Sequence, residues 1–305
     1  MENHQRKLRK HRNYLWFITP GFILYTLLVV IPILYVIYLS LFEWSGLGEM
    51  KFIGLSNFNL LMTDKKISAD FWGAVRNNLK YLLCIWFIVT PLQFLTAYLF
   101  YIRIPAHKYL KFMIFMPYVI SSTIVSFFAT MIFNPNIGIL NKFLAAIGLP
   151  QGSWLGDPQW AFKIFIALVL WQSAGSGMMI FYSNLLDMPK DVLEAGSIDG
   201  CSEVQKFFHI LIPLSLPSCA STIIMSTIWA LSVFDLPFIL GGPNGGVRGC
   251  LDFVNLVFYR YTFGSVLNAQ SNLGFGAAIS TAMLVVIAIV TAVQNKLLSK
   301  FEYDM

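Results

Sequence analysis

The sequence is short of charged residues. Asp, Glu, Lys and Arg make up 12% of the 305 residues and hydrophobic residues 57%, whereas charged residues are about a quarter of an ordinary soluble domain. This composition excludes a typical soluble globular protein. The mean hydropathy of +0.68 indicates an integral membrane protein.

Motifs for catalysis and phosphate binding are also missing. The chain has no Gly-x-x-x-x-Gly-Lys-[Ser/Thr], the pattern that supplies both the glycine backbone and the lysine of a phosphate cradle. It has no His-Glu-x-x-His, no Gly-x-Ser-x-Gly and no carboxylate pair within a membrane run. The four cysteines lack the paired spacing of a metal site or disulfide framework, and no basic–aromatic array suggests nucleic acid. We therefore expect no enzyme, no bound metal and no cofactor on this chain.

Long apolar runs are what the chain does contain. A hydrocarbon core about 30 Å thick needs about 20 apolar residues in helical form, and six runs qualify. They are residues 14–42, 78–102, 109–133, 161–186, 211–240 and 273–298. We predict an all-α membrane protein with six transmembrane helices in one domain, 14–298, between tails 1–13 and 299–305.

The basic residues predict an orientation. If the amino terminus is cytoplasmic, more than half of the 21 Lys and Arg lie in the tails and inner segments, and the rest are spread along longer outer segments. The positive-inside rule then predicts that both termini are cytoplasmic. The first run is too long for a signal-peptide core and lacks a small-x-small cleavage site, so we expect a retained anchor.

A polar insert, residues 187–212, separates the fourth and fifth runs. Asp187 followed by Pro189 predicts a helix start, because a short polar side chain can cap free amides and proline suits the first turn. In that helix, small side chains at i, i+3 and i+4 form a face that a partner's backbone can approach closely. The face consists of Val192, Ala195 and Gly196.

Two further signals predict a turn and a second helix in this insert. Asp199-Gly200 interrupts the first helix, since glycine reaches left-handed dihedrals without a Cβ penalty. Ser202-x-x-Gln205 has the capping-box pattern that starts another helix. That second helix carries an apolar stripe. The stripe consists of Val204, Phe207, Phe208 and Leu211.

The same stretch resembles the "EAA" loop of permease subunits of ATP-binding-cassette (ABC) importers. In the carbohydrate branch this loop reads Glu-Ala-Ala, Asp-Gly-Ala, Gln-x-Phe and Leu-Pro. The corresponding places here are Glu194-Ala195-Gly196, Asp199-Gly200-Cys201, Gln205-x-Phe207 and Ile212-Pro213. The chain departs from the commonest version at Gly196, Cys201 and Ile212. Outer segments, among them Phe234-Asp235 with Gly241-Gly242-Pro243, extend the resemblance to nearly the full length.

The resemblance implies the type I ABC importer permease fold, with a cytoplasmic coupling helix between helices 4 and 5. It implies a heterodimer with a second, homologous permease in a bacterial cell membrane, and two ATPase subunits that bind ATP and Mg. It also implies an extracellular solute-binding protein that delivers a carbohydrate. Glu194 is expected to meet a basic residue of the ATPase, and Gly200 to permit the tight turn. The residues expected to couple the permease to the ATPase subunits are Glu194, Ala195, Gly196, Asp199, Gly200, Gln205 and Phe207.

Polar side chains within the apolar runs suggest a solute path, because they tend to face the bundle interior or water. Trp171, Gln172 and Ser176 in the fourth run combine an aromatic ring with amide and hydroxyl groups, which suits a sugar. Trp229 and Asp235 in the fifth run are candidates for the same wall. The alternative is that small residues such as Ser176 only allow close packing, that Gln172 bonds across helices and that Asp235 lies at the outer interface.

Three other functions stay open at this stage: an ABC permease for a non-sugar solute, a self-contained secondary transporter and a membrane-embedded enzyme. A secondary transporter normally places coupling carboxylates or broken helices near the midplane, and the central parts of these runs lack charged residues. An embedded enzyme needs reactive groups clustered at one membrane face, and only the polar insert comes close.

Overall fold

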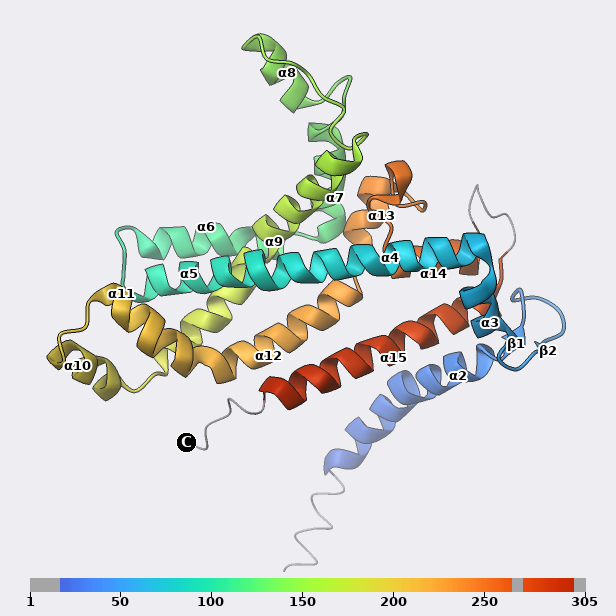
Figure 1. Cartoon of the computed structure of the whole chain (residues 1–305), viewed down its shortest axis with the longest axis horizontal. Helices are drawn as coiled ribbons and strands as arrows, with labels where there is room; N and C mark the ends of the chain where they lie inside the picture. Colours follow the sequence, from blue (N-terminus) through green and yellow to red (C-terminus); the bar gives the residue numbers. More distant parts are fainter. Residues whose placement is uncertain (1–16, 265–270, 299–305) are drawn as a thin grey trace, which may run out of the picture. The chain divides into compact units, whose positions relative to one another are not determined.

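The computed structural model describes residues 17–264 and 271–298 (Figure 1). The described residues contain five helices long and apolar enough to cross a membrane, and a sixth candidate if one bent pair counts as a single span. The predicted all-α membrane fold with six spans is confirmed. The predicted tails 1–13 and 299–305 and the first residues of the first predicted span lie outside the described residues.

The chain divides into two compact units, Met1–Asp64 with Tyr261–Ala282, and Lys65–Arg260 with Met283–Met305. The first unit contains the helix Phe17–Leu39, which is followed by a short antiparallel ribbon and one short helix. Asn57 ties that short helix to the preceding segment, because its Nδ2 donates to the carbonyls of Ser40 at 2.8 Å and Phe42 at 2.9 Å. The elements are η1 (Thr26–Val30), α2 (Ile31–Leu39), β1 (Phe42–Glu43), β2 (Lys51–Phe52) and α3 (Ser56–Thr63).

The second unit contains most of the membrane helices. Helices α14 (Val254–Phe263) and α15 (Leu273–Leu298) have residues in both units. The other elements of the second unit are α4 (Lys65–Cys84), η2 (Ile85–Val89), α5 (Thr90–Tyr101), α6 (His107–Val119), α7 (Ser122–Ile132), α8 (Ile139–Ala146), α9 (Pro158–Leu186), α10 (Lys190–Ile198), α11 (Glu203–Lys206), η3 (Phe207–Leu211), α12 (Ile212–Leu231), α13 (Asp235–Gly241) and η4 (Val247–Gly249).

Three π-helical segments interrupt the long helices, and all three have the same cause in the sequence. A proline stands two positions after the end of each segment: Pro32 after η1, Pro91 after η2 and Pro213 after η3. Proline lacks an N–H and its ring clashes with the carbonyl four residues earlier, so the preceding turn widens. Each proline then lies in the first turn of the next α-helix, where it is tolerated.

One predicted span is sharply bent, which corrects the sequence analysis. The run 109–133 is not one straight helix, because α6 and α7 meet at 93°. Ile120 and Ser121 between them have ψ angles of 133° and 135°, and Pro117 removes a donor from the last turn of α6. The run 211–240 is interrupted only locally, between the end of α12 at Leu231 and the start of α13 at Asp235, and Cys219–Gly241 remains one candidate span.

The predicted second span begins too late. Helix α4 starts at Lys65, and α4, η2 and α5 continue as one helix of 37 residues, Lys65–Tyr101. The first turns of α4 carry charged and polar side chains, so hydropathy alone did not include them. The fourth and sixth predicted spans, 161–186 and 273–298, agree with α9 and α15 to within a few residues.

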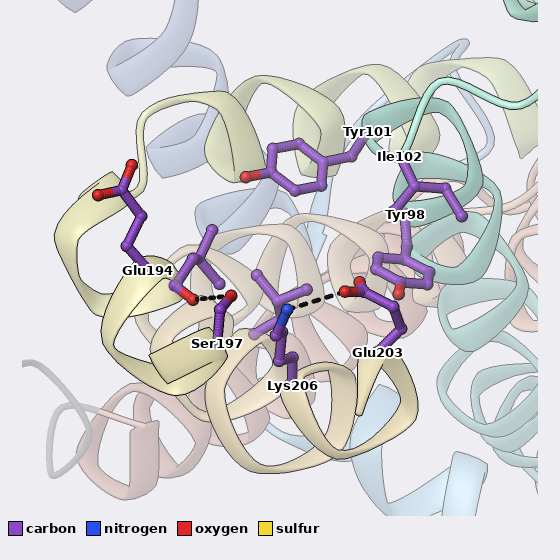
Figure 2. A pocket seen from close by; sticks show the side chains of 9 residues that line it. Tyr98, Tyr101, Ile102, Glu194, Ser197, Glu203 and Lys206 are labelled. Carbon is purple, nitrogen blue, oxygen red and sulfur yellow. Dashed lines mark hydrogen bonds and ion pairs between the residues drawn. The ribbon is translucent and has the colours of Figure 1, made fainter. Parts of the chain in front are cut away.

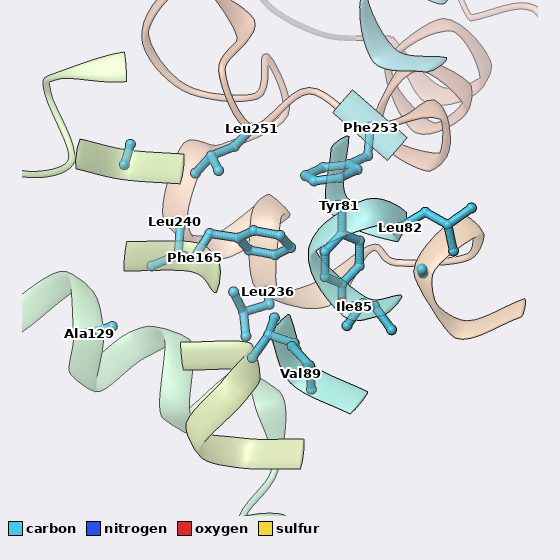
Figure 3. Packing of buried hydrophobic residues seen from close by; sticks show 13 residues of the cluster. Tyr81, Leu82, Ile85, Val89, Ala129, Phe165, Leu236, Leu240, Leu251 and Phe253 are labelled. Atoms are coloured by element: carbon cyan, nitrogen blue, oxygen red, sulfur yellow. The ribbon is translucent and has the colours of Figure 1, made fainter. Parts of the chain in front are cut away.

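Among the described residues, two buried apolar clusters pack helices of the second unit together. Figure 3 shows the first, in which the Tyr81 ring lies 4.9 Å from that of Phe165 and 5.9 Å from that of Phe253, joining α4, α9 and the segment before α14. The second contains Phe94, Phe181 and further buried residues, and joins α5 and α9 to the polar insert. The continuous helix Lys65–Tyr101 therefore packs on α9 at two places, through α4 and η2 in the first cluster and through α5 in the second.

Candidate functional site

The polar insert, residues 187–212, folds as a compact elbow between α9 and α12, and we use the name elbow for these residues. Figure 1 shows α10 and α11 together at one end of the second unit, next to the end of α5. The predicted order of helix, sharp turn and helix is confirmed. The elbow thus brings the predicted coupling residues into one short segment of chain.

The turn of the elbow is a Schellman motif. Gly200 has φ +79°, the left-handed conformation predicted for it. The Cys201 N–H donates to the Gly196 carbonyl at 2.9 Å and the Gly200 N–H to the Ser197 carbonyl at 3.2 Å. These bonds satisfy the last carbonyls of α10, so the turn is fixed by its own backbone.

The start of α11 is the predicted capping box. The Gln205 N–H donates to Ser202 Oγ at 3.3 Å, and the Ser202 N–H donates to Gln205 Oε1 at 2.8 Å. The side chain of Gln205 is therefore already used within the elbow. Its structural role is to start the second helix of the elbow.

The predicted start of α10 is wrong by a few residues. Asp187 does not cap α10, because it is the last residue of α9's final turn and its N–H donates to the Ser183 carbonyl at 3.1 Å. Helix α10 begins at Lys190, after Pro189 at the N-cap position, and has no side-chain cap. A residue before proline is disfavoured in the helical region, which separates the two helices at Met188.

The predicted small-residue face of α10 is only partly open. Val192 and Ala195 are exposed, but Gly196 is buried. A Cβ on Gly196 would lie 2.6 Å from Cδ1 of Ile210, on the second helix of the elbow. Gly196 therefore allows the two helices of the elbow to pack closely, and it does not belong to an open face.

The predicted apolar stripe of the second helix divides into two parts. Phe207 packs on α5, with its ring 4.5 Å from Tyr98 and 5.7 Å from Phe94, and Leu211 is buried. Val204 and Phe208 are exposed. One part of the stripe fixes the elbow to α5, and the other remains on the surface.

The apex of the elbow carries the exposed members of the predicted coupling set. These are Glu194, Ala195, Asp199 and Gly200, while Gln205 is exposed at the start of the second helix. None of the described side chains forms an ion pair or hydrogen bond with the Glu194 carboxylate. A surface hollow of about 260 Å³ lies between the elbow and the end of α5 (Figure 2).

Of the predicted solute-path residues of α9, Gln172 forms hydrogen bonds to other parts of the bundle. Gln172 Nε2 donates to the Ile120 carbonyl at 2.8 Å, and Ser122 Oγ donates to Gln172 Oε1 at 3.3 Å. Gln172 thereby satisfies polar groups at the break between α6 and α7. Ser176 Oγ donates to the Ser173 carbonyl of its own helix at 3.0 Å. Gln172 therefore bonds across helices and Ser176 within its own helix, and both stay candidates for the solute path.

The other predicted path residues are on the surface of the described chain. Trp171 is 48% exposed and Trp229 is 73% exposed. Asp235 is exposed in the first turn of α13. Within residues 17–264 and 271–298, no hydrogen bond or ring contact joins Trp171, Ser176, Trp229 and Asp235 to one another, so a single binding wall made of them stays a prediction.

Two asparagines on α4 were missed as structural residues. Asn78 Nδ2 donates to the Ala230 carbonyl at 3.1 Å, and the Val254 N–H donates to Asn78 Oδ1 at 3.0 Å. Asn77 Nδ2 donates to the carbonyls of Gly249 and Asp252, both at 2.9 Å. Two adjacent amides at the start of an apolar run were the only signal in the sequence.

A buried ion cluster lies beside these asparagines. Arg260 donates to Asp252 at 2.9 Å and to the Pro243 carbonyl at 3.0 Å, and Asp70 lies 3.5 Å from Arg260. Burial raises the pKa of Asp252 to about 6, although the hydrogen bond and charge of Arg260 lower it; the charge of Asp70 adds to the rise. The cluster joins α4, α14 and the glycine-rich segment before it.

A third polar group of residues lies inside the bundle. Thr227 Oγ1 accepts hydrogen bonds from Trp86 Nε1 at 3.1 Å and Gln294 Nε2 at 2.9 Å. Gln294 Oε1 is buried and has no hydrogen-bond partner among the described residues. Here α12, α15 and the π-helical segment η2 meet through side chains far apart in the sequence.

A comparison with family models matches residues 90–302 to the model described as "Binding-protein-dependent transport system inner membrane component". The matched region includes the whole elbow. Among curated proteins, the chain is similar to the probable ABC transporter permease protein YurN of Bacillus subtilis, with 32% identity over 92% of this chain and 94% of that protein. The multiple sugar-binding transport system permease protein MsmF of Streptococcus mutans is 29% identical over 97% of this chain and 99% of its own.

The fold also resembles a solved structure. The similar chain comes from the crystal structure of a bacterial ABC transporter involved in the import of the acidic polysaccharide alginate. The TM-score is 0.82 at 20% identity, over 97% of this chain and 100% of that chain. At this identity the likeness concerns the fold alone, and it extends over almost every described helix.

Proposed function

The chain belongs to the family of binding-protein-dependent transport system inner membrane components, and on this basis we propose that it is the permease subunit of an ATP-driven ABC importer for a carbohydrate. The observation that carries the proposal is the elbow, a rigid turn of two helices at one end of a bundle of membrane helices. A carbohydrate is favoured because a relative covering nearly all of both chains is named for multiple sugar-binding transport.

Energy and solute are supplied by other subunits in this proposal. Two ATPase subunits bind ATP and Mg, a second homologous permease completes the membrane domain, and an extracellular solute-binding protein delivers the carbohydrate. The sequence lacks the phosphate-binding motif, which supports ATP hydrolysis by separate subunits. The excess of basic residues in the segments on the elbow's side supports a cytoplasmic elbow and two cytoplasmic termini.

Coupling in this proposal depends on the stiffness of the elbow. The Schellman turn and the capping box hold its two helices, and Phe207 and Leu211 fix it to α5. A displacement of the apex by the ATPases is therefore transmitted to α5, α9 and α12 together. The membrane helices then alternate between an outward-open and an inward-open arrangement around the solute.

The solute path is the least constrained part of the proposal. Trp171, Trp229 and Asp235 offer exposed aromatic and carboxylate groups. The unpartnered Oε1 of Gln294, beside Thr227, is an acceptor that suits a hydroxyl donor. Polar groups inside membrane bundles tend to face such paths.

Replacing Gly200 by Arg tests the coupling role directly. A non-glycine residue is strained at φ +79°, and the arginine projects from the apex of the elbow. In membranes that contain all the partner subunits, we expect loss of ATPase association and of carbohydrate uptake. Gly148→Arg is the matched control, because Gly148 also has positive φ (+76°) and open space around it, but lies between α8 and α9.

The proposal is overturned if Gly200→Arg inserts normally and retains ATPase association and uptake. The break between α6 and α7 is a feature that secondary transporters share. Uptake that continues without any ATPase and stops when the ion gradient is dissipated would support a secondary transporter instead. A binding protein whose bound ligand is not a saccharide would refute the carbohydrate substrate and leave the importer unaffected.

A further inference from the structure

The segment between α7 and α9 is folded around one buried asparagine of α8. Asn141 Nδ2 donates to the carbonyls of Pro135 at 2.8 Å and Gly152 at 2.9 Å. Its Oδ1 accepts from the Gly152 N–H at 3.2 Å and from Trp154 Nε1 at 2.8 Å. These bonds hold residues 134–157 in one compact loop, which we call the α8 loop.

The burial pattern of α8 is the reverse of that of a helix on a water-facing surface. Such a helix buries apolar side chains and exposes polar ones, but here Asn141 is buried, whereas Ile139 is 71%, Phe143 59% and Ile147 54% exposed. The three apolar positions are spaced by four residues, so their side chains form one stripe along the helix. An exposed apolar stripe of this kind marks a surface that lipid or protein covers.

The α8 loop lies at the opposite side of the membrane from the elbow. Helix α9 has 29 residues and begins at Pro158, directly after the loop, and the elbow follows its other end. Its length of about 43 Å exceeds the hydrocarbon core of about 30 Å, so the loop and the elbow lie at opposite surfaces. Figure 1 shows α8 beyond the ends of α7 and α9, apart from α4 and α12, and running across the direction of α9.

Two observations favour lipid as the cover of the stripe. Trp154 and Trp160 pack edge to face with 5.4 Å between ring centroids, and Lys163 Nζ lies 4.8 Å from the centroid of the Trp160 ring. Tryptophans and long basic side chains are typical of the boundary between headgroups and acyl chains. The exposed apolar surface also continues from Ile132, at the end of α7, through Ile137 into α8.

We propose that α8 is an interfacial helix, with the stripe of Ile139, Phe143 and Ile147 inserted at the boundary between headgroups and acyl chains. Exposed Lys142 lies on the flank of this stripe, where its ammonium group can pair with a lipid phosphate. The inference rests on the membrane location of the family and on the geometry of the loop, and it holds whatever solute is carried. An anchored α8 fixes the depth at which α7 ends and α9 begins.

Spin-label accessibility tests this in the membrane complex, isolated with its partner subunits and reconstituted in liposomes of phosphatidylethanolamine and phosphatidylglycerol. A label inserted in lipid is open to oxygen and shielded from a water-soluble nickel chelate. We therefore expect an oxygen-to-nickel accessibility ratio several-fold higher at Phe143 than at Ala145. Ala145 is the matched control, because it is exposed on the same helix and lies about 200° around the axis from Phe143. The labels are placed in a variant with alanine in place of Cys84, Cys201, Cys219 and Cys250.

Labels at Ile139 and Ile147 measure the orientation of the helix. These positions are about 12 Å apart along the axis, so a helix lying in the surface gives them the same depth and a helix inserted end-on separates them by that distance. Replacing both Ile139 and Phe143 by Glu should withdraw the stripe from lipid and raise nickel access at Ile147 several-fold. Replacing both by Leu keeps the stripe apolar and should leave nickel access at Ile147 unchanged.

Three results would overturn the interfacial helix. Equal nickel access at Phe143 and Ala145 would place the stripe in water. Shielding of Phe143 from both reagents would place protein there: the solute-binding protein if shielding needs its addition, or another subunit if it does not. A depth difference of about 12 Å between Ile139 and Ile147 would show an inserted helix. These readings involve neither the elbow nor the ATPase, so failure of this inference and failure of the proposed function are distinguishable.

Discussion

Replacing Asn78 by Ala should destabilise the protein strongly, although Asn78 touches no proposed partner. The side chain is 1% exposed and lies on α4. Its Nδ2 donates to the carbonyl of Ala230 at 3.1 Å, and its Oδ1 accepts the Val254 N–H at 3.0 Å. One amide therefore joins α4 to the end of α12 and the start of α14.

The magnitude follows from what the substitution leaves behind. The Val254 N–H and the Ala230 carbonyl would both be buried without a partner, and each such group costs about 1–3 kcal/mol. Water entering the space left by the amide recovers part of this loss, so we expect about 2–4 kcal/mol in total. In a large domain 1 kcal/mol corresponds to about 2–4 °C, so the melting temperature should fall by about 4–16 °C.

The assay is thermal unfolding of the purified protein in detergent, followed by intrinsic tryptophan fluorescence. Asn59→Ala is the matched control, because Asn59 is an exposed asparagine in α3 and the helix-propensity change is the same. The control should melt within about 1 °C of wild type. An Asn78→Ala protein that melts together with the control would refute the claim that this amide holds three helices.

Two further predictions concern packing and pH. Gly175→Ala should destabilise the protein, because a Cβ there would lie 2.5 Å from the backbone Cα of Phe115 on α6. Gly73 is the control: it is a helical glycine with no atom within 4 Å of an added Cβ, so Gly73→Ala should be neutral or stabilising in the same thermal assay. Equal melting temperatures for the two variants would refute the close contact at Gly175. The pKa of Asp252 is raised from 3.8 to about 6, so the folded state holds the proton more tightly than the unfolded state. The contribution of Asp252 to the free energy of unfolding should therefore fall as the pH rises from about 4 to about 6. The difference in melting temperature between wild type and Asp252→Asn should shrink or turn against wild type over that range, and a difference that does not change with pH would contradict the raised pKa.

Local signals in the sequence were sufficient for the elbow. Gly200 and the pair Ser202 and Gln205 act on backbone within a few residues, so their effect does not depend on the rest of the fold. Hydropathy was sufficient to locate the spans, because each membrane helix satisfies its own backbone hydrogen bonds, but it predicted neither the bend between α6 and α7 nor the start of α4. The type of fold followed from these two facts.

Contacts between distant residues were not predictable in the same way. Gln172 was proposed for a solute path because its side chain is polar, but its partner is the Ile120 carbonyl, which is free only because the helix breaks there. Asn77 bonds to Gly249 and Asp252, more than 170 residues away. No pattern along the chain encodes such pairs, since they depend on how the helices pack.

The π-helical segment η2 also determines which way α5 faces. A π-helical turn holds about one residue more than an α-helical turn, and one residue corresponds to about 100° of rotation about the helix axis. The side chains after Pro91 are thus out of phase with those before it, although Lys65–Tyr101 is one continuous helix. The wide turn before Pro91 therefore helps to set the direction in which the Phe94 side chain points, which is toward Phe181 of α9.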